Sequence, residues 1–273
     1  MKTRVALSIA GSDSSAGAGL QADLKTFSAL GVYGATVVTA ITAQNTLGVT
    51  AVHIVPAAVI AAQIDAVFSD LSIAAVKTGM LGSEEAIAAT AAGLERWARG
   101  VPVIADPVMV STSGSRLLEP GAEKVLVERL IPLAALITPN LHEAAALLGV
   151  PVARNEDEVK EQAQRLFALG PRAVLVKGGH GEGCDATDIL YDGTAFHSYT
   201  APRVLTANTH GTGCTLASAI AAFLVQGHSL ERAAAEAKAY LQGALARADD
   251  LAIGQGPGPV SHFYRFGRLP PSG

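Results

Sequence analysis

The chain has 273 residues, with 20 Lys and Arg against 24 Asp and Glu, a formal net charge of −4, and 49% hydrophobic residues. A charged fraction of 16% disfavours disorder, a coiled coil or a nucleic-acid-binding protein, because it offers no dense basic surface for phosphate backbones. The length suffices for one large α/β domain or two smaller ones. We therefore expect small-molecule partners and no nucleic acid.

Targeting and redox signals are weak. The apolar stretch 5–10 is too short for a signal peptide and ends at Gly11. Residues 26–64 contain no charged side chain, but polar residues, glycines and Pro56 interrupt them before about 18 apolar residues accumulate. The two cysteines are too few for a disulfide framework or a zinc site. We expect a reduced, cytoplasmic protein with no membrane span.

Short β-branched runs alternate with helical patterns along the chain, which is typical of a largely parallel sheet covered by helices. The runs are nearly all apolar, as expected of strands buried on both faces. The predicted strands span residues 4–10, 35–41, 74–78, 101–106, 135–138 and 173–177.

Helical periodicity lies between and after these runs. Residues 56–71 form an amphipathic pattern, with Pro56 in the first turn and Val59 on the apolar stripe. Further helices are predicted at 156–169, 213–226 and 230–251.

One late segment departs from the alternation. Asp192-Gly193, between the runs 188–191 and 194–199, predicts a β-hairpin, which we expect near the mouth of the site. No linker or internal repeat divides the chain. We therefore expect one α/β domain over residues 1–273, with its site at the carboxyl ends of the strands.

Two common nucleotide-binding motifs are not met. Gly17-Ala18-Gly19-Leu20-Gln21-Ala22 matches the dinucleotide fingerprint formally, but it lies six residues beyond Gly11 and lacks the acidic ribose partner. Lys77-Thr78-Gly79 has the residues of a Walker loop in a different order. Both folds are disfavoured.

A stronger signal is Asn208-Thr209-His210-Gly211-Thr212-Gly213-Cys214, directly before an Ala-rich helix. Glycines let consecutive N–H groups converge, and the helix start adds partial positive charge, which predicts an anion hole. An ordinary helix start capped by Thr209 or Thr212 is the alternative. Cys214 is either a small buried hydrophobe or a thiol shifted towards thiolate.

Five motifs share the order and spacing of ribokinase-like small-molecule kinases: residues 10–26, Asp106-Pro107-Val108-Met109, Thr138-Pro139-Asn140-Leu141-His142-Glu143, Val176-Lys177-Gly178-Gly179-His180 and Gly211-Thr212-Gly213-Cys214. From about residue 5 to the segment 256–262, the chain resembles the hydroxymethylpyrimidine/phosphomethylpyrimidine kinases of thiamine biosynthesis. The resemblance implies a three-layer ribokinase-like fold with a small hairpin near the site. It also implies ATP and Mg²⁺ as cofactors, and a homodimer.

The resemblance implies roles at the nucleotide end: nucleotide binding for Asn140, Lys177, Thr209 and Lys238, and metal binding for Asp106 and Glu143. Asn140 and Glu143, three apart at a helix start, suit Mg²⁺ through its water shell. Lys177 ends a buried strand and needs an anionic partner, which a nucleotide phosphate or sugar would provide. An exposed helix acid at Glu143, a turn residue at Asp106 and a solvated Lys238 are the alternatives.

Gln44 is the candidate for acceptor recognition. Its carboxamide complements the amino group and ring nitrogen of a 4-aminopyrimidine, although Gln44-Asn45 is equally an ordinary loop turn. Asp23 resembles the family's other polar contact to the pyrimidine. His210 is a possible stacking partner, with a structural role as the alternative. The walls implied by the resemblance are Gly11, Ala18, Met80 and Val108.

The catalytic role is assigned to Gly211, Thr212, Gly213 and Cys214. Most ribokinase relatives have Asp where this chain has Cys214, whereas the pyrimidine kinases and some pyridoxal kinases similar to them share the Cys. We expect the backbone N–H groups to contribute most, with Cys214 as a secondary base. The loop 111–116 is a predicted lid. Arg116 is a candidate phosphate contact, with a solvent-facing loop arginine as the equal alternative.

These features together predict an ATP-dependent enzyme that phosphorylates 4-amino-5-hydroxymethyl-2-methylpyrimidine and then its monophosphate. A pyridoxine or pyridoxal kinase is the alternative on the same fold, because those rings also carry a hydroxymethyl group. A sugar kinase is disfavoured by Cys214. A nucleotide-binding regulator or a dehydrogenase would differ in showing no turnover or a nicotinamide requirement.

Overall fold

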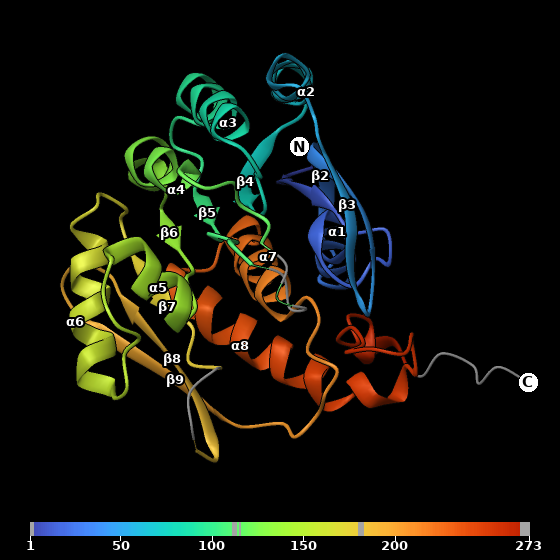
Figure 1. The fold of residues 1–273 in the computed structure, drawn as a ribbon, viewed down its shortest axis with the longest axis vertical. Coiled ribbons are helices and arrows are strands. Elements are labelled where there is room, and N and C mark those ends of the chain that lie inside the picture. The colour runs from blue at the N-terminus through green and yellow to red at the C-terminus, as the bar shows by residue number, and fades with distance from the viewer. Residues whose placement is uncertain (1–2, 111–113, 115, 180–182, 268–273) are drawn as a thin grey trace, which may run out of the picture.

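The computed structural model describes residues 3–110, 114, 116–179 and 183–267. His180 of the fourth motif and residues 111–113 and 115 of the predicted lid therefore lie outside the described residues. The ribbon runs from blue at β1 to red at the C-terminal segment that follows α8 (Figure 1).

The described strands form one mixed sheet, in the order β3-β2-β1-β4-β5-β6-β7-β8-β9. The centre of the sheet is parallel, while β3 at one edge and β8 and β9 at the other run antiparallel to their neighbours. The strands are β1 (Val5–Ser12), β2 (Tyr33–Asn45), β3 (Gly48–Ile54), β4 (Ile73–Thr78), β5 (Val103–Ala105), β6 (Leu136–Ile137), β7 (Val174–Val176), β8 (Asp185–Tyr191) and β9 (Phe196–Pro202).

All six predicted central strands are confirmed, with ends that differ by a few residues. The edge strand β3 was not predicted. Residues 51–53 are all exposed, so no apolar alternation marks this segment, and it is held as a strand by its pairing with β2. The register of that pairing shifts between Ala43 and Gln44. Such an irregularity re-aims the following side chain.

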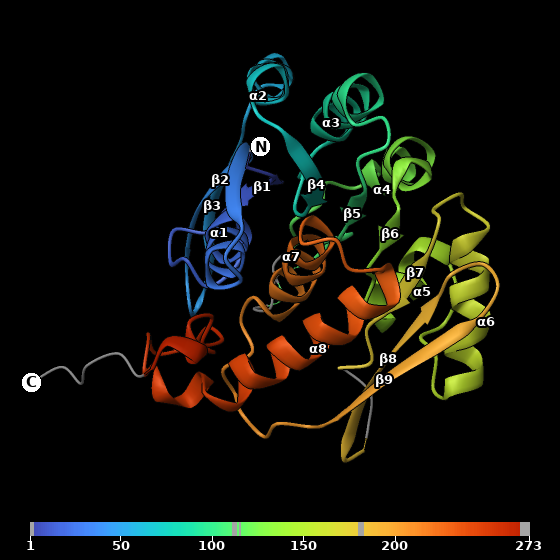
Figure 2. The same cartoon turned by 180° about the vertical axis from the view of Figure 1, so that it is seen from behind.

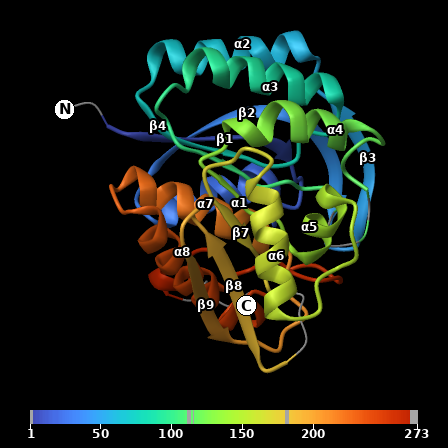
Figure 3. The same ribbon diagram turned by 90° about the vertical axis from the view of Figure 1, so that its left-hand side faces the viewer.

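Helices cover both faces of the sheet (Figures 1, 2 and 3). One layer contains α1, α7 and α8, and the other contains α2 to α6. The helices are α1 (Gly19–Ala29), α2 (Ala57–Asp70), α3 (Glu84–Trp97), α4 (Ala122–Val125), α5 (Leu141–Leu148), α6 (Glu156–Phe167), α7 (Thr212–Val225) and α8 (Leu230–Ala246).

The four predicted helices correspond to α2, α6, α7 and α8. Two details of the first were wrong. Pro56 precedes α2 as its N-cap instead of lying in its first turn, and Val59 is 48% exposed. The apolar stripe is narrower than predicted because only Ile60 and Ile64 are fully buried against the sheet.

Because a strand is pleated, its successive side chains point alternately into the hydrophobic cores on the two faces of the sheet. In β1, Leu7 and Ile9 face the layer of α2 and α3, whereas Ala6 faces α7. With both faces covered, the strand ends are the parts of the sheet that remain available for polar groups. The three-layer α/β fold predicted from the sequence is confirmed.

The β8–β9 hairpin is present, but its turn lies away from the site. Val174, which starts β7, pairs with Tyr191, which ends β8. The Asp192-Gly193 turn therefore lies at the end of the sheet where the parallel strands begin, opposite their carboxyl ends. There Gly193 faces the ring of Phe167 on α6. The open end of the hairpin, near Ala186 and Pro202, is the part that reaches the site. Among the described residues, no helix is long and apolar enough to cross a membrane.

Candidate active site

A cleft of about 700 Å³ lies at the carboxyl ends of β1, β2, β4, β5, β6 and β7. Apart from the candidate phosphate contact Arg116, all but one of the residues assigned to the site from the sequence line it. The lining members are Gly11, Ala18, Gln44, Met80, Asp106, Val108, Asn140, Glu143, Lys177, Thr209, Gly211, Thr212, Gly213, Cys214 and Lys238. Asp23 is the exception.

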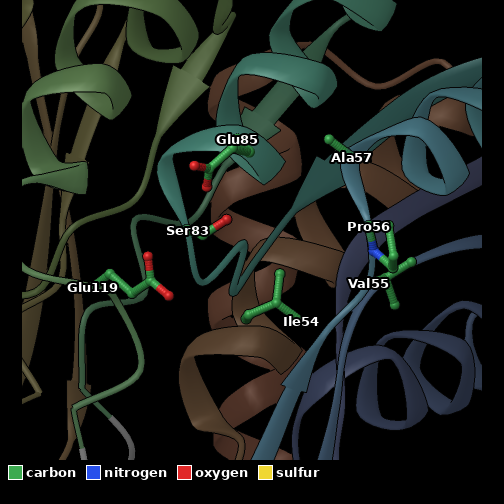
Figure 4. A pocket seen from close by; sticks show the side chains of 7 residues that line it. All are labelled: Ile54, Val55, Pro56, Ala57, Ser83, Glu85 and Glu119. Atoms are coloured by element: carbon green, nitrogen blue, oxygen red, sulfur yellow. The ribbon is translucent and has the colours of Figure 1, made fainter.

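A second pocket, of about 300 Å³, lies between the end of β3 and the start of α3 (Figure 4). Glu85 and Glu119 give it a negative rim, and the Ser83 hydroxyl accepts a hydrogen bond from the N–H of Ala86 as the cap of α3. None of the predicted site residues lines this pocket. The larger cleft is therefore the candidate active site.

The anion hole predicted at the start of α7 has a suitable backbone. Gly211 is the N-cap with φ +81°, and no described side chain caps the helix, so the alternative of a Thr209 or Thr212 cap is wrong. A Cβ on Gly213 would lie 3.3 Å from Lys177 Nζ and 3.5 Å from Asp106 Oδ2. The uncapped start of α7 thus lies at the cleft, directly beside the ammonium of Lys177.

Lys177 does find an anionic partner, but the partner is the protein itself. Its Nζ lies 2.8 Å from Asp106 Oδ1 and 3.8 Å from Glu143 Oε2. Burial alone would lower the pKa of Lys177, but the two carboxylates raise it above its ordinary value. The ammonium therefore stays charged where it lines the cleft, and Asp106 and Glu143 are its anionic partners in place of the expected nucleotide phosphate or sugar.

Asn140 and Glu143 form a capping box at the start of α5. The Asn140 side chain accepts from the Glu143 N–H, and the Glu143 carboxylate accepts from the Asn140 N–H. Glu143 is 8% exposed, so the alternative of an exposed helix acid is wrong. Burial raises its pKa, with Lys177 acting in the opposite direction. The box fixes one oxygen of Glu143 and leaves the second for other contacts.

Lys238 is not a solvated helix lysine. Its Nζ lies 2.8 Å from Asp188 Oδ2, and the other oxygen of Asp188 accepts from the N–H of Gly178. A Cβ on Gly178 would lie 1.8 Å from the carbonyl oxygen of Thr187, so only glycine fits there. Asp188, which the sequence analysis did not single out, thus positions both Lys238 and the loop after β7.

Cys214 lines the cleft at the first turn of α7, yet its thiol is not shifted towards thiolate. Burial raises its pKa to about 11, and the nearby Lys77 only partly offsets this rise. The helix-start argument predicted the opposite direction. It failed because burial of the thiol outweighs the favourable dipole.

Asp23 does not reach the cleft. It is fully buried on α1, where its carboxylate accepts from Lys77 Nζ at 2.8 and 2.9 Å and from the hydroxyls of Ser8 and Ser218. Its predicted contact with the pyrimidine is therefore wrong in this structure. Lys77 was missed as a partner, although a lysine inside the apolar strand β4 was the available signal.

Gln44 enters the cleft directly after the register shift in β2. Its backbone is bound to Ser14, whose hydroxyl donates to the Gln44 carbonyl at 2.6 Å and accepts from its N–H at 2.8 Å. The side chain contacts the Thr42 hydroxyl at 3.2 Å. Gln44 is therefore a fixed part of the site and not an ordinary loop residue.

His210 joins the anion-hole loop to the loop after β1. Its Nε2 lies 2.8 Å from Asp13 Oδ2, and its ring packs on Gly17, where a Cβ would lie 2.3 Å from Cδ2. The same Asp13 carboxylate accepts from the N–H groups of Ser15, Gly17 and Ala18. This contact agrees with the structural alternative for His210.

The C-terminal segment also contributes to the site. The N–H groups of Gln255 and Gly256 donate to the Thr46 hydroxyl at the β2–β3 turn, and the Gly258 carbonyl accepts from the N–H of His210. Arg116, by contrast, donates to Glu123 at 2.6 Å and to the Leu118 carbonyl. It does not line the cleft, so its predicted phosphate contact is not supported.

The fold and this cleft together define a small-molecule kinase of the ribokinase-like type. The model of the phosphomethylpyrimidine kinase family matches residues 13–261, and the chain belongs to that family. The resemblance inferred from the five motifs, and with it the prediction of a phosphotransferase, is confirmed.

Individual relatives agree with this assignment. The chain is 57% identical over 264 residues to the hydroxymethylpyrimidine/phosphomethylpyrimidine kinase of Rhizobium meliloti, covering 97% of this chain and 98% of that protein. The Escherichia coli enzyme of the same name is 50% identical over 266 residues, with coverages of 97% and 100%.

Solved structures show the same fold. A phosphomethylpyrimidine kinase from Clostridium difficile has a TM-score of 0.79 at 45% identity and covers 89% of this chain and 100% of its own. The pyridoxal kinase of Staphylococcus aureus, in complex with AMP-PCP and pyridoxal, has a TM-score of 0.88 at 34% identity, with coverages of 98% and 96%.

Proposed function

We propose that this chain transfers the γ-phosphoryl group of ATP to the hydroxymethyl group of 4-amino-5-hydroxymethyl-2-methylpyrimidine and then phosphorylates the monophosphate to the diphosphate. One observation carries the proposal: a single cleft holds the Gln44 carboxamide at its acceptor end and an uncapped helix start beside Lys177 at its phosphate end. The names of the relatives point to the same pair of acceptors.

The donor end suits a nucleoside triphosphate. The N–H groups at the start of α7 and the ammonium of Lys177 offer hydrogen bonds and charge to phosphate oxygens, and Lys238 adds a second cation on the same wall. Apolar side chains of Val204, Leu241 and Leu245 provide a surface for a purine ring. A structural neighbour in complex with AMP-PCP supports ATP as the donor.

The residues present fit Mg²⁺. Asp106 and Glu143 both line the cleft, and each uses one oxygen in the contacts with Lys177. Two carboxylates with few further protein ligands would suit an ion that keeps several of its waters. When bound, the ion supplies charge neutralisation of the phosphate oxygens. Asp106 and Glu143 would hold it, and Lys177 orients both carboxylates.

The acceptor end positions the hydroxymethyl group. Gln44 pairs with the polar edge of the ring, while Gly11, Ala18, Met80 and Val108 enclose its faces. Because a Cβ on Gly11 would lie 3.0 Å from the sulfur of Met80, this wall is closely packed. The ring is then held with its hydroxymethyl group towards the start of α7, which favours in-line transfer over hydrolysis.

We assign transition-state stabilisation to the N–H groups of Gly211, Thr212 and Gly213, of which that of Thr212 donates to the Thr209 carbonyl at 3.3 Å in this structure. Cys214 adjoins them as a neutral thiol, since its pKa is raised to about 11. A loose transition state needs little removal of the acceptor proton before transfer. The thiol is therefore a polar wall first and a base second. The second acceptor, an ionised phosphate, needs no base.

A pyridoxal kinase is the second candidate function, favoured by the TM-score of 0.88 to the Staphylococcus aureus enzyme. A coupled ADP-release assay separates the two. Equal concentrations of the hydroxymethylpyrimidine, its monophosphate and pyridoxal are compared, with a no-acceptor control. The proposal expects turnover with both pyrimidines and at least tenfold lower kcat/KM with pyridoxal. Preference for pyridoxal would replace the proposal by the second candidate.

We also propose a homodimer in the cytoplasm. The edge strand β3 and its neighbour β2 expose Ile41 and Val52, at 54% and 44%, and a second copy would cover them. Sedimentation equilibrium at micromolar concentration tests the dimer, for which twice the chain mass is expected. A monomer across the concentration range would contradict it.

A further inference from the structure

The contacts around Gln44 raise the question of which end of its carboxamide faces the ligand. The Thr42 hydroxyl lies 2.7 Å from the carbonyl oxygen of Ser12 and 3.2 Å from the Gln44 carboxamide, at the end assigned as Oε1. Oxygen and nitrogen at the end of a glutamine are distinguished by their hydrogen-bond partners and not by position. The partners here decide the orientation.

A hydroxyl has one proton to donate. The Ser12 carbonyl can only accept, and it is the nearer partner, so it takes the proton of Thr42. The side of the hydroxyl that faces Gln44 then offers a lone pair. Only the Nε2 end of the carboxamide can satisfy a lone pair, so the contact is a donation from Gln44 to Thr42.

We infer that Thr42 is a specificity-determining positioning residue: it holds Nε2 of Gln44 and thereby turns Oε1 towards the ligand as an acceptor for an exocyclic amine. This inference rests on the proposed function and deepens it. The remaining Nε2 proton faces the adjoining ring nitrogen. A carbonyl oxygen in place of the amine would meet the Oε1 lone pairs and be rejected, because it has no proton to donate.

The surroundings hold this arrangement in place. Thr42 is 4% exposed, so water does not compete for its hydroxyl. The Ser12 carbonyl is fixed because Gln21 binds both the Ser12 hydroxyl, at 2.9 Å, and the Asp13 N–H, at 2.8 Å. Ser14 fixes the backbone of Gln44. Thr42 therefore links the last residue of β1 to the side chain proposed to recognise the ligand.

The test compares two acceptors that differ only in the amine: 4-amino-5-hydroxymethyl-2-methylpyrimidine and 5-hydroxymethyl-2-methylpyrimidine. In wild type we expect the amino compound to be preferred in kcat/KM. Thr42→Val keeps the shape but frees the carboxamide to turn, so that preference should fall about tenfold while the KM for ATP stays constant. Thr42→Ser keeps the hydroxyl and should therefore retain the wild-type preference for the amino compound.

Thr50→Val is the matched control, because it removes a threonine hydroxyl that donates to the Ala43 carbonyl in the same hairpin without contacting Gln44. It should leave the preference unchanged. If Thr42→Val does not fold, Thr42→Ala removes the same hydroxyl with less bulk and takes its place.

An unchanged preference in a folded Thr42→Val or Thr42→Ala enzyme would overturn the role of Thr42 while leaving the proposed function standing. Loss of the preference for the amino compound in a folded Thr42→Ser enzyme would also overturn the role of Thr42. A wild-type enzyme that phosphorylates neither pyrimidine would overturn the proposed function, and the role of Thr42 with it.

Discussion

His210 and Asp13 join two loops that are 197 residues apart in the sequence, with 2.8 Å between Nε2 and Oδ2. One loop carries the proposed anion hole, and the other carries Ala18 at the proposed acceptor wall, and both line the cleft. The contact therefore fixes the phosphate end of the cleft relative to its acceptor end. A kinase needs this relation held constant, because a small displacement between donor and acceptor costs a large factor in rate.

The acid dependence of stability tests this contact. Burial would raise the pKa of Asp13, but hydrogen bonds from His210, Ser15 and Ala18 lower it to about 2. A depressed pKa stabilises the folded state above the ordinary pKa of about 4, and that stabilisation is lost as the pH falls towards 2. Asp13→Asn should lower the free energy of unfolding by about 2 kcal/mol at pH 7. Urea unfolding from pH 3 to pH 7 should show the two proteins converging at the acid end. Parallel curves would contradict this role.

Gln44→Ala should lower kcat/KM for the aminopyrimidine by about 10- to 100-fold, because the polar edge of the ring loses its partner at a cost of about 1–3 kcal/mol. The KM for ATP should stay constant. Gln44→Glu should be tolerated better if the amino group is the main contact, since a carboxylate still accepts from it. Steady-state kinetics with each substrate varied in turn measures both. Unchanged acceptor kinetics in Gln44→Ala would remove Gln44 from the site.

Gly213→Ala should fold and lose activity. The added methyl group would lie 3.3 Å from Lys177 Nζ and narrow the space for the phosphoryl group, so kcat should fall by about 10- to 100-fold. Gly211→Ala is the contrasting variant, because its Cβ would lie 2.0 Å from the Gly17 carbonyl at a φ of +81°. It should lose stability as well as activity. Thermal unfolding and ADP release distinguish the two, and full activity in Gly213→Ala would contradict the anion hole.

The buried pair of Lys77 and Asp23 should act on stability. Lys77→Met leaves the Asp23 carboxylate buried without its cation, at a cost of about 3–5 kcal/mol in the free energy of unfolding. Asp23→Asn with Lys77→Met should recover part of this loss. Urea unfolding of the single and double variants provides the measurement. A folded Asp23→Asn enzyme of normal stability with a raised KM for the pyrimidine would instead return Asp23 to the acceptor site.

The strands and the cleft were predictable because the central strands are largely apolar runs, and the polar or glycine residues that line the cleft directly follow them in the sequence. Asp106 after β5 and Lys177 after β7 are examples. Which charges pair with which was not predictable, since it depends on contacts across the sheet. The Asp23 carboxylate pairs with the ammonium of Lys77, 54 residues further along the chain, and therefore does not reach the cleft. The direction of the Cys214 pKa shift depended on burial, which the motif alone did not reveal.

Cys214→Ser and Cys214→Asp separate the two roles of the thiol. If the backbone N–H groups dominate, Cys214→Ser should keep activity within about tenfold on both acceptors. If the thiolate takes the alcohol proton, Cys214→Ser should slow the first transfer far more than the second, and Cys214→Asp should keep substantial activity. Rates with each purified acceptor decide between them. Comparable losses on both acceptors would count against any role as a base.

The most direct test follows the pyrimidine product itself by phosphorus NMR during turnover with ATP and Mg²⁺. If one cleft serves both transfers, the monophosphate should accumulate first and then convert to the diphosphate, and Gly213→Ala should slow both steps together. A reaction that ends at the monophosphate, or a Gly213→Ala enzyme that loses only one of the two steps, would contradict the single site.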